Sequence, residues 1–534
     1  MRDNSSPNTE FNRGLAAFNG GDYDTALRHF SAAVELGHDD ADAHNYLGLT
    51  HLKQGRIDDA MDCFVMAAHF RPDFAEAYYN LALAAQRRDA HREAVGYLQR
   101  ALAARADYAE AYTALGASLL VLGDPQQAAA HFGKAVELRP DDAHAHSNLG
   151  YVLLRDLGEY ERGAAHLKTA LNLNKNDADI WCNYCSVLLH EGRLDEAISV
   201  YDQLLTAKPN LHEARLNRAL AALMLGRFAE AWPDYEARKL VRSNYVPRPY
   251  AFPEWRDDAL AGKTVLVYAE QGLGDEIMFA SCLPDLLGQA DKCILECSPR
   301  LAALFRRSFP GAAIHAAQQS DPDVGRLAQA GPIDYQVASG SLPGFFRRQW
   351  ADFPRHAGYL RADPARIDYW HARLRALGTG LKVGISWRGG MLSTRRDLRS
   401  TALCAWLPLL CSQGCHFVSL QYGDVSAEVA TVVKDHAVNV HHWQQAIDDY
   451  DDTAALVSAL DLVISVQTAV VHLAGALGKS VWVMLPASPE WRYLSRGTMM
   501  PWYPSARLFR QQPLDGWQPT IAAVAAELAA LLKA

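Results

Sequence analysis

Small and apolar residues recur along the first half of the chain with a period of 34 residues. Each repeat has one small residue at this spacing and another small residue twelve positions before it. In most repeats a glycine lies between the two, five positions before the later one. This period predicts two helices per repeat, which cross at the small residues and are joined by the glycine turn. Seven repeats fit between residue 10 and about 240, with one inserted residue near Asp156; their recurring small residues are Ala26, Ala60, Ala94, Ala128, Gly163, Ala197 and Ala231.

From Thr264 onward, short apolar runs alternate with helical patterns. This alternation predicts parallel β-sheets covered by helices, arranged as two α/β lobes. The predicted strands span 265–268, 294–297 and 335–337 in the first lobe and 381–387, 417–420, 462–465 and 480–484 in the second, and a helical tail spans 521–532. The predicted organisation is a flexible N-terminus at 1–9, a repeat array at 10–240, a linker at 241–260, and lobes at 261–375 and 376–534.

The linker differs in composition from both of its neighbours. Residues 243–255 contain three prolines and four aromatic residues. Proline prevents a regular helix, and the aromatic side chains predict a segment that packs onto a surface. We therefore expect a fixed joint between the array and the lobes.

The composition is that of a globular protein, with 49% hydrophobic and 21% charged residues among 534. The formal charge of −9 argues against a general nucleic-acid-binding protein. No apolar signal region follows Met1, and no uninterrupted run of about 18 apolar residues is present. The nine cysteines form no disulfide framework, and Cys182 and Cys185 are interpreted as packing residues of a repeat helix. We expect a cytoplasmic protein in a reducing compartment.

The 34-residue repeats resemble tetratricopeptide repeats, whose paired helices stack into a superhelix with a concave face. In five of the seven repeats, asparagine stands two positions before the earlier small residue. In this family the position points into the concave groove, where an amide can pair with the backbone of an extended peptide; alternatively, these side chains bond neighbouring helices. The array also resembles that of the protein O-linked N-acetylglucosamine transferases, which implies a protein partner. The candidate groove residues are Asn80, Asn148, Asn183 and Asn217.

A glycine turn follows the first predicted strand, in the sequence Gln271-Gly-Leu-Gly-Asp275. A strand, a glycine turn and a helix in succession present backbone N–H groups to a ligand. Gly272 and Gly274 allow the backbone to turn sharply and to approach a bound group. Asp275 then lies at the carboxyl end of a strand, where open α/β sheets bind substrates. Such a turn also occurs as plain structural punctuation, so the motif alone leaves both interpretations open.

Further motifs lie at 384–390, 397–400, 419–421, 451–453 and 461–478. Together with 271–275, they resemble the heptosyltransferase-related glycosyltransferases of lipopolysaccharide assembly. They are more similar still to bacterial tetratricopeptide-linked glycosyltransferases, some of which modify flagellin. The resemblance covers about 260–515 and implies the GT-B architecture of two Rossmann-like lobes. It also implies a nucleotide-sugar donor and no other cofactor. No Asp-x-Asp metal motif stands in a convincing context, so we expect a metal-independent enzyme.

Glycosyl transfer needs a base for the acceptor proton and cationic or N–H groups for the leaving phosphate. The resemblance implies that Asp275 is the base, with Glu276 as the second candidate; the alternative is a helix N-terminal carboxylate worth about 0.3–1 kcal/mol. Of the four arginines that follow the first strand of the second lobe (Arg388, Arg395, Arg396 and Arg399), Arg388 and Arg399 are expected to reach the phosphate, because a guanidinium suits phosphate oxygens. The other predicted donor-binding residues are Gly272, Gly274, Trp387, Gln421, Gln467, Thr468 and Ala469, and His472 is either catalytic or a satisfied core histidine.

Related sequences usually have aspartate where this chain has Gln467, near the expected position of the donor sugar. Glutamine does not repel an anion, so we hypothesise a donor sugar that carries a carboxylate, as in a CMP-activated nonulosonic acid. The acidic run 448–452 precedes a predicted helix and is interpreted as its N-terminal cap rather than as a metal site.

These features predict a glycosyltransferase that modifies serine or threonine of a protein recruited by the array, and the resemblance suggests flagellin as that protein. Two alternatives remain open. One is a non-catalytic scaffold whose lobes bind a nucleotide sugar without turnover. The other is a glycosyltransferase that acts on a glycan or a lipid-linked acceptor.

Overall fold

The computed structural model describes residues 6–37, 40–241, 248, 250–318, 327, 331–390, 396–512 and 515–533. By their contacts, the residues form two compact units, Met1–Val187 and Leu188–Ala534. The first contains repeat helices only, and the second contains the last repeat helices together with both β-sheets. The division therefore falls inside the array and not at the linker expected at 241–260.

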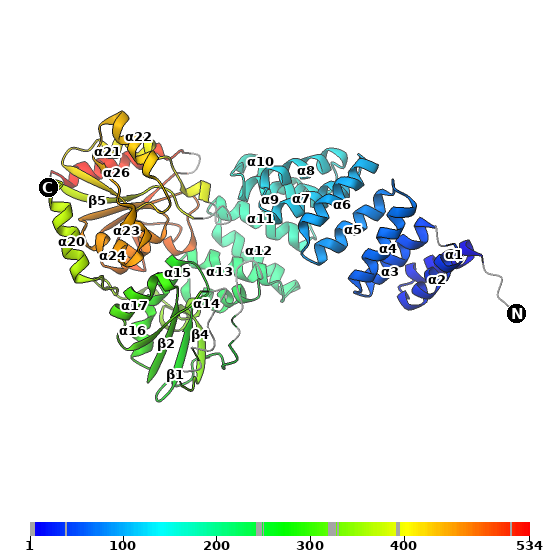
Figure 1. Cartoon of the computed structure of the whole chain (residues 1–534), viewed down its shortest axis with the longest axis horizontal. Helices are drawn as coiled ribbons and strands as arrows, with labels where there is room; N and C mark the ends of the chain where they lie inside the picture. The colour runs from blue at the N-terminus through cyan, green and yellow to red at the C-terminus, as the bar shows by residue number, and fades with distance from the viewer. Residues whose placement is uncertain are drawn as a thin grey trace. The chain divides into compact units, whose positions relative to one another are not determined.

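Fourteen α-helices follow one another in the described residues up to Tyr235, as the 34-residue period predicts (Figure 1, blue to green). Within the first compact unit, α1 packs on α2, and the same holds for the pairs that begin with α3, α5, α7 and α9. The array helices are α1 (Pro7–Asn19), α2 (Tyr23–Leu36), α3 (Ala41–Lys53), α4 (Ile57–Phe70), α5 (Ala75–Arg87), α6 (His91–Ala104), α7 (Ala109–Val121), α8 (Pro125–Leu138), α9 (Ala143–Arg155), α10 (Tyr160–Leu173), α11 (Ala178–His190), α12 (Leu194–Ala207), α13 (His212–Met224) and α14 (Phe228–Tyr235), which η1 (Glu236–Lys239) continues.

Glycines fix the geometry of the helix pairs at two places. Where α7 crosses α8, a Cβ atom on Gly116 would lie 2.8 Å from the buried ring of Phe132. At the turns, six glycines have φ between 69° and 84°, which L residues rarely adopt. The third repeat has Asp89 there instead, with φ of 57°, and aspartate is among the few residues that tolerate this conformation.

The described residues of the linker are fixed to the first sheet. Tyr250 and Trp255 are buried. The Trp255 N–H donates to the Gln336 carbonyl at 2.8 Å, and the Gln336 N–H donates to the Pro253 carbonyl at 2.8 Å. Residues 250–255 of the linker therefore pack onto the first sheet.

The first lobe contains a four-stranded parallel sheet in the order β3-β2-β1-β4 (Figure 1). Its strands are β1 (Thr264–Tyr268), β2 (Lys292–Cys297), β3 (Ala312–Ala316) and β4 (Tyr335–Ala338), of which β3 was not predicted. Its helices are α15 (Leu273–Phe279), η2 (Ala280–Cys282), α16 (Leu283–Leu287), η3 (Pro299–Leu301), α17 (Ala302–Ser308), η5 (Ser339–Ser341), α19 (Pro343–Phe346), η6 (Trp350–Asp352) and α20 (Pro364–Arg375).

The second lobe contains a seven-stranded sheet in the order β10-β11-β9-β8-β5-β6-β7, parallel except for the β10–β11 pair. Apart from β10, this strand order is that of a doubly wound α/β fold, whose topological switch point lies between β5 and β8. The strands are β5 (Leu381–Ser386), β6 (Cys415–Ser419), β7 (Val440–His441), β8 (Leu462–Val466), β9 (Val481–Leu485), β10 (Met499–Met500) and β11 (Tyr503–Arg510). The helices are η8 (Arg396–Arg399), η9 (Leu403–Trp406), α21 (Leu407–Leu410), α22 (Ser426–His436), α23 (Gln444–Asp448), α24 (Tyr450–Ala459), α25 (Ala469–Ala476), η10 (Trp491–Tyr493) and α26 (Gln518–Leu531).

Two hydrophobic cores cover the faces of the second sheet. Along β9, Val481, Val483 and Leu485 belong to one core, and Trp482 and Met484 belong to the other. Strands buried on both faces form continuous apolar runs, which is why β5, β6, β8 and β9 were predicted. The first of these cores continues into the first lobe and into α13 and α14. Among the described helices, none combines the length and the apolarity needed to cross a bilayer.

Candidate functional site

The predicted donor-binding segments lie at the carboxyl ends of parallel strands. Residues 387–390 follow β5, Gln421 follows β6, and 467–469 follow β8. Because β5 and β8 flank the topological switch point, this edge of the sheet is where α/β folds of this order bind ligands. In the first lobe, the turn that contains Gly272 follows β1 and leads into α15, which contacts α25 of the second lobe.

Asp275 faces the second lobe. It is the third residue of α15, and its Oδ1 accepts a hydrogen bond from Nη2 of Arg492 at 2.5 Å. Arg492 also pairs with Glu490, which in turn pairs with Arg399. The Asp275 side chain keeps 18% of its surface exposed. The predicted base is therefore joined to a predicted phosphate-binding arginine through two residues that the sequence did not single out.

The neighbouring Glu276 lies in a different environment. It is buried, and its Oε2 accepts a hydrogen bond from the Ser298 backbone N–H at 2.8 Å. Burial raises the pKa of this carboxyl to about 7, against the opposing effect of that hydrogen bond. A carboxyl that titrates near neutral pH is suited to proton transfer, so Glu276 keeps its place as the second candidate base.

His472 lies in the contact between α15 and α25. A Cβ atom on Gly274 would lie 2.9 Å from its ring, so the close approach of the two helices depends on glycine. His472 is buried, and its Nδ1 lies 3.1 Å from the hydroxyl of Tyr503. Burial lowers the pKa of this imidazole well below its ordinary value, so the ring is neutral at physiological pH. This arrangement agrees with the alternative of a satisfied core histidine.

Carboxylates hold the predicted phosphate-binding arginines. Nη2 of Arg388 lies 2.8 Å from Oε2 of Glu428, and the Arg388 side chain is 40% exposed. Arg399 is buried in the charge network that contains Asp275. Arg396 is exposed, and Arg395 lies outside the described residues. A bound phosphate would therefore have to replace the carboxylates that pair with Arg388 and Arg399.

Gln421 holds the loop that follows β5. Its Oε1 accepts hydrogen bonds from the backbone N–H groups of Trp387 at 3.0 Å and Arg388 at 2.8 Å. Its Nε2 donates to the Arg388 carbonyl at 3.0 Å. Trp387 is fully buried, with its indole N–H directed at Glu428. Gln421 and Trp387 therefore position Arg388.

The turn after β8 contains a buried amide without a partner. Gln467 is 3% exposed, and within the described residues its Nε2 has no hydrogen-bond partner. A Cβ atom on Gly389 would lie 2.6 Å from the Gln467 carbonyl oxygen, so the loops after β5 and β8 touch. Thr468 caps α25 through Oγ1, which accepts the Val470 N–H at 3.2 Å, and Ala469 begins the helix. An unpaired buried donor costs about 1–3 kcal/mol, which an acceptor atom of a ligand would recover.

A buried ion pair at the end of β1 was not predicted. Nη2 of Arg238, from η1, donates to Oε1 of Glu270 at 2.7 Å, and both side chains are buried. The same oxygen accepts the Gly340 N–H at 3.0 Å, and a Cβ atom on Gly340 would lie only 2.4 Å away from it. Glu270 directly precedes the motif 271–275, but nothing in the sequence marks Arg238 as its partner.

The acidic run 448–452 caps a helix, as predicted. Asp449 accepts the backbone N–H groups of Asp451 at 3.0 Å and Asp452 at 3.3 Å at the start of α24. Asp451 also accepts two hydrogen bonds, at 3.0 and 2.8 Å, from Arg307 of the first lobe. In the part of the chain that the structure describes, no group of three or more histidine, cysteine, aspartate or glutamate side chains is arranged to hold a metal ion.

The asparagine column lies partly inside the helix packing. Nδ2 of Asn80 donates to Oδ1 of Asn45 at 2.9 Å, and Nδ2 of Asn183 donates to Oγ of Ser147 at 3.0 Å. These two bonds agree with the alternative that the column joins neighbouring helices. Asn148, Asn183 and Asn217 remain half-buried.

Tetratricopeptide-repeat profiles match residues 11–68, 119–182, 153–212 and 212–231. The N-terminal part of the chain is therefore an array of tetratricopeptide repeats, and an α/β region with parallel sheets follows it.

Among known proteins, the chain is similar to Protein FlbA of Caulobacter vibrioides, with 38% identity over 328 residues. The match covers 58% of this chain and 54% of FlbA, so the chain spans about half the length of that relative. Because the match covers 58% of this chain, it is longer than the segment that ends at Leu240, and the similarity extends beyond the repeat helices.

Two solved structures align with parts of the chain. MamA is 26% identical, covers 30% of this chain and 94% of its own, and has a TM-score of 0.29. YrrB, described as a TPR protein with an unusual peptide-binding site, is 20% identical, covers 35% of this chain and 95% of its own, and has a TM-score of 0.30.

Proposed function

We propose that this chain is a glycosyltransferase that moves a sugar from a nucleotide-sugar donor to a serine or threonine hydroxyl of a protein. The observation that carries the proposal is the position of Asp275. This carboxylate follows the first strand of one parallel sheet and contacts Arg492 of the other lobe. The predicted donor-binding segments gather at the switch-point edge of that lobe's sheet. The acceptor that we propose is flagellin, on the strength of the motif resemblance.

In the proposed reaction, the acceptor hydroxyl oxygen forms a bond to the anomeric carbon while the bond from that carbon to the phosphate oxygen breaks. The hydroxyl proton passes to Asp275, and the leaving phosphate keeps the electron pair. A positioned general base contributes about 10²–10⁴-fold to such a step. Arg388 and Arg399 would stabilise the charge on the leaving phosphate once it displaces their carboxylate partners.

The donor that we propose carries a carboxylate on its sugar, as a CMP-activated nonulosonic acid does. The support is Gln467, whose buried Nε2 lacks a partner within the described residues and can donate to a carboxylate oxygen. Titration of the purified chain should show tighter binding of the CMP-activated acid than of a UDP-hexose. Gln467→Asp should reverse this order, because a carboxylate there repels the anionic sugar. Equal or tighter binding of the UDP-hexose by the unmodified chain would contradict the proposal.

The tetratricopeptide repeats would recruit the acceptor, since arrays of this kind present an extended concave surface to polypeptides. Asn80 bonds the side chain of Asn45, but within the described residues the half-buried Asn148 and Asn217 make no such side-chain hydrogen bond. These two asparagines are therefore the first candidates for contact with a bound chain.

The test is the intact mass of flagellin co-expressed with the chain. We expect a mass increment of one or more sugar units with the unmodified chain, and its value identifies the sugar class. Asp275→Asn should reduce the initial rate of modification by about 10²–10⁴-fold. Asp368→Asn, a matched change at an exposed aspartate of α20, should leave it unchanged.

Two outcomes would redirect the proposal. If Asp275→Asn remains folded and modifies flagellin at the unmodified rate, Asp275 is not the base, and Glu276→Gln becomes the decisive variant. If neither variant changes the cellular role of the chain and no mass increment appears, a non-catalytic scaffold explains the chain better. A mass increment on a glycan or lipid in place of flagellin supports the other acceptor class.

A further inference from the structure

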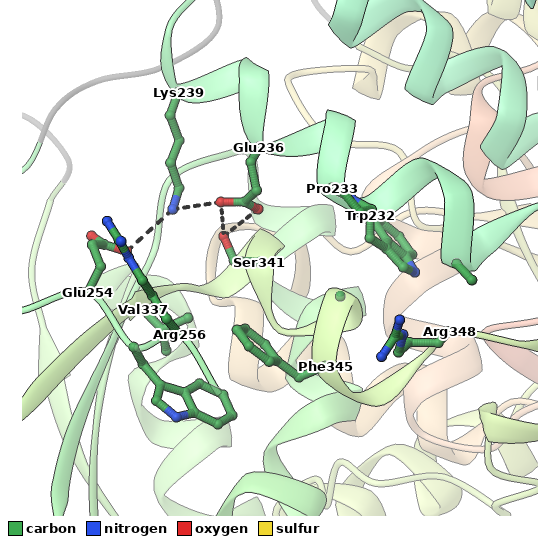
Figure 2. Close-up of a pocket in the computed structure, with 13 residues that line it drawn as sticks. Trp232, Pro233, Glu236, Lys239, Glu254, Arg256, Val337, Ser341, Phe345 and Arg348 are labelled. Carbon is green, nitrogen blue, oxygen red and sulfur yellow. Dashed lines mark hydrogen bonds and ion pairs between the residues drawn. The ribbon is translucent and has the colours of Figure 1, made fainter. Parts of the chain in front are cut away.

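A pocket of about 400 Å³ lies between the last repeat helix and the first lobe (Figure 2). Its walls come from α14 and η1, from η5 and α19, and from residues 254–256, with Val337 of β4 also lining it. This volume falls within the range of about 300–1,000 Å³ that is typical of ligand pockets. None of the described residues that line it belongs to the predicted donor site.

Aromatic rings give the pocket its apolar surface. Trp255 stacks on Phe345, with ring centroids 4.1 Å apart and an angle of 25° between the planes. Trp232 also lines the pocket. The indole N–H of Trp255 already donates to the Asp258 carbonyl at 2.9 Å, and that of Trp232 donates to the Arg347 carbonyl at 2.7 Å. The tryptophans therefore offer apolar surface to a ligand and no free donors.

The acidic groups of the pocket already have cationic partners. Nζ of Lys239 lies 2.9 Å from Glu236 and 3.4 Å from Glu254 (Figure 2). Glu236 also accepts the Ser341 hydroxyl at 2.8 Å and a guanidinium N–H of Arg238 at 2.7 Å. Burial opposes ionisation of Glu236, but Arg238 and Lys239 lower its pKa to about 2. The carboxylate is thus ionised at neutral pH and pairs with both cations, while Lys239 also pairs with Glu254 and Arg238 also pairs with Glu270.

Two cations of the pocket remain without partners. Arg256 and Arg348 are exposed, and neither guanidinium makes an ion pair or hydrogen bond within the described part of the chain. Figure 2 shows the two side chains on opposite sides of the pocket, with Phe345 between them. A phosphate site would instead bring cations and backbone N–H groups together at one point. The separation favours a ligand with two anionic groups on either side of an apolar one.

We propose that this pocket binds an acidic peptide segment in which an aromatic or large apolar side chain stands between carboxylates. The apolar side chain packs against Phe345 and Trp232, and the flanking carboxylates pair with Arg256 and Arg348. A polypeptide is the occupant because the pocket adjoins the last helix of an array whose repeat class presents surfaces to polypeptides. The binding proposed here does not depend on sugar transfer.

The test is fluorescence anisotropy of a fluorescein-labelled peptide that has one phenylalanine between pairs of glutamates, titrated with the full chain. We expect saturable binding that weakens as salt is added, because the carboxylate pairs are exposed at the rim. The double variant Arg256→Glu, Arg348→Glu should weaken binding by at least about tenfold, since both charge-assisted contacts become repulsive. Arg375→Glu, the same change at an exposed arginine of α20, should bind as the unmodified chain does.

Three further ligands test whether the pocket is specific for an acidic peptide with an apolar side chain. A peptide with lysines in place of the glutamates should not bind, and a peptide with alanine in place of phenylalanine should bind at least about fivefold more weakly. Equal binding of the lysine peptide, or an unchanged affinity in the double variant, would overturn the proposal. Binding of uridine monophosphate that is lost in the double variant, without binding of the acidic peptide, would assign the pocket to a nucleotide instead.

Discussion

At the scale of single residues, the candidate site contains two adjacent carboxylates that lie in different surroundings. Successive helix residues point about 100° apart, so the start of α15 directs Asp275 towards the second lobe and Glu276 into the first. Asp275 pairs with the cation of Arg492. The hydrogen-bond partner of Glu276 is the uncharged Ser298 N–H, and this bond does not offset the cost of burying a charge.

Replacement of Glu276 by glutamine should change how stability depends on pH. The pKa of this carboxyl is about 7 in the folded chain, against an ordinary value of 4.5. Between these values the folded state binds more protons than the unfolded state, so the free energy of unfolding falls as pH rises. Glu276→Gln stays uncharged and escapes this loss. The free energy of unfolding of Glu276→Gln, relative to that of the unmodified chain, should rise by about 2 kcal/mol between about pH 5 and pH 8. Chemical denaturation at several pH values measures this difference.

Glu213→Gln is the matched control, because Glu213 is exposed on α13 in the same compact unit. The difference in the free energy of unfolding between Glu213→Gln and the unmodified chain should stay constant over the same pH range. If Glu276→Gln also shows a constant difference from the unmodified chain, the carboxyl at 276 ionises normally, and burial does not control its titration.

The sequence reveals one side of this site more readily than the other. Asp275 stands beside glycines in a recognisable turn, and Arg399 follows a predicted strand. Arg492 and Glu490 lie in 488–497, which has neither helical nor strand periodicity, and Arg492 is 217 positions from its partner Asp275. Contacts of this kind depend on how two lobes meet, so local patterns cannot identify them.

At the scale of elements, small residues decide how closely the repeat helices pack. Gly116 contacts the ring of Phe132, and a Cβ atom there would lie 2.8 Å from it. A Cβ atom on Gly133, in the middle of the neighbouring helix α8, would meet nothing within 4 Å beyond its chain neighbours and the backbone of its own helix. Both glycines weaken their helices through backbone entropy, but only Gly116 is required by a contact.

Alanine at these two positions should therefore have opposite effects. Gly116→Ala gains helix propensity of about 1 kcal/mol but overpacks a buried crossing by about 1–3 kcal/mol, so we expect a net loss of about 1 kcal/mol. Gly133→Ala should stabilise the array by about 0.5–1 kcal/mol. Thermal unfolding followed by circular dichroism on each variant checks both signs. Stabilisation by both substitutions would mean that Phe132 moves aside without cost.

Strands buried on both faces were predictable, and strands that are short or have an exposed face were not. The strands at the centre of the second sheet are covered on both faces and appear as apolar runs. β3 is an edge strand with the sequence Ala-Ala-Ile-His-Ala and a partly exposed face. β11 alternates buried and exposed positions, and β7 and β10 have two residues each. An apolar run is therefore a signal of two-sided burial and misses strands with one open face.

At the scale of the whole chain, the last repeats are structural parts of the α/β region. Residues of α13 and α14 belong to the same hydrophobic core as both sheets. The Trp232 indole N–H donates to the Arg347 carbonyl at 2.7 Å, and Arg238 forms a buried pair with Glu270 at 2.7 Å. The sequence places these residues in the array because they continue its period, and only the packing shows which core they complete.

This packing predicts where the chain can be cut. A truncation that begins at Ala178 keeps α11 to α14 and should fold, whereas one that begins at Val241 should aggregate. The shorter chain exposes core residues that α14 covers, at about 1.5–3 kcal/mol for each large side chain. It also removes Arg238, the cation that pairs with Glu270. Size-exclusion chromatography and thermal unfolding of the two truncations make the comparison. A monomeric, cooperatively unfolding chain that begins at Val241 would show that the α/β region forms its core without the array.

The chain that begins at Ala178 should still bind the sugar-nucleotide donor. It should no longer modify the protein acceptor, because the first repeats are missing.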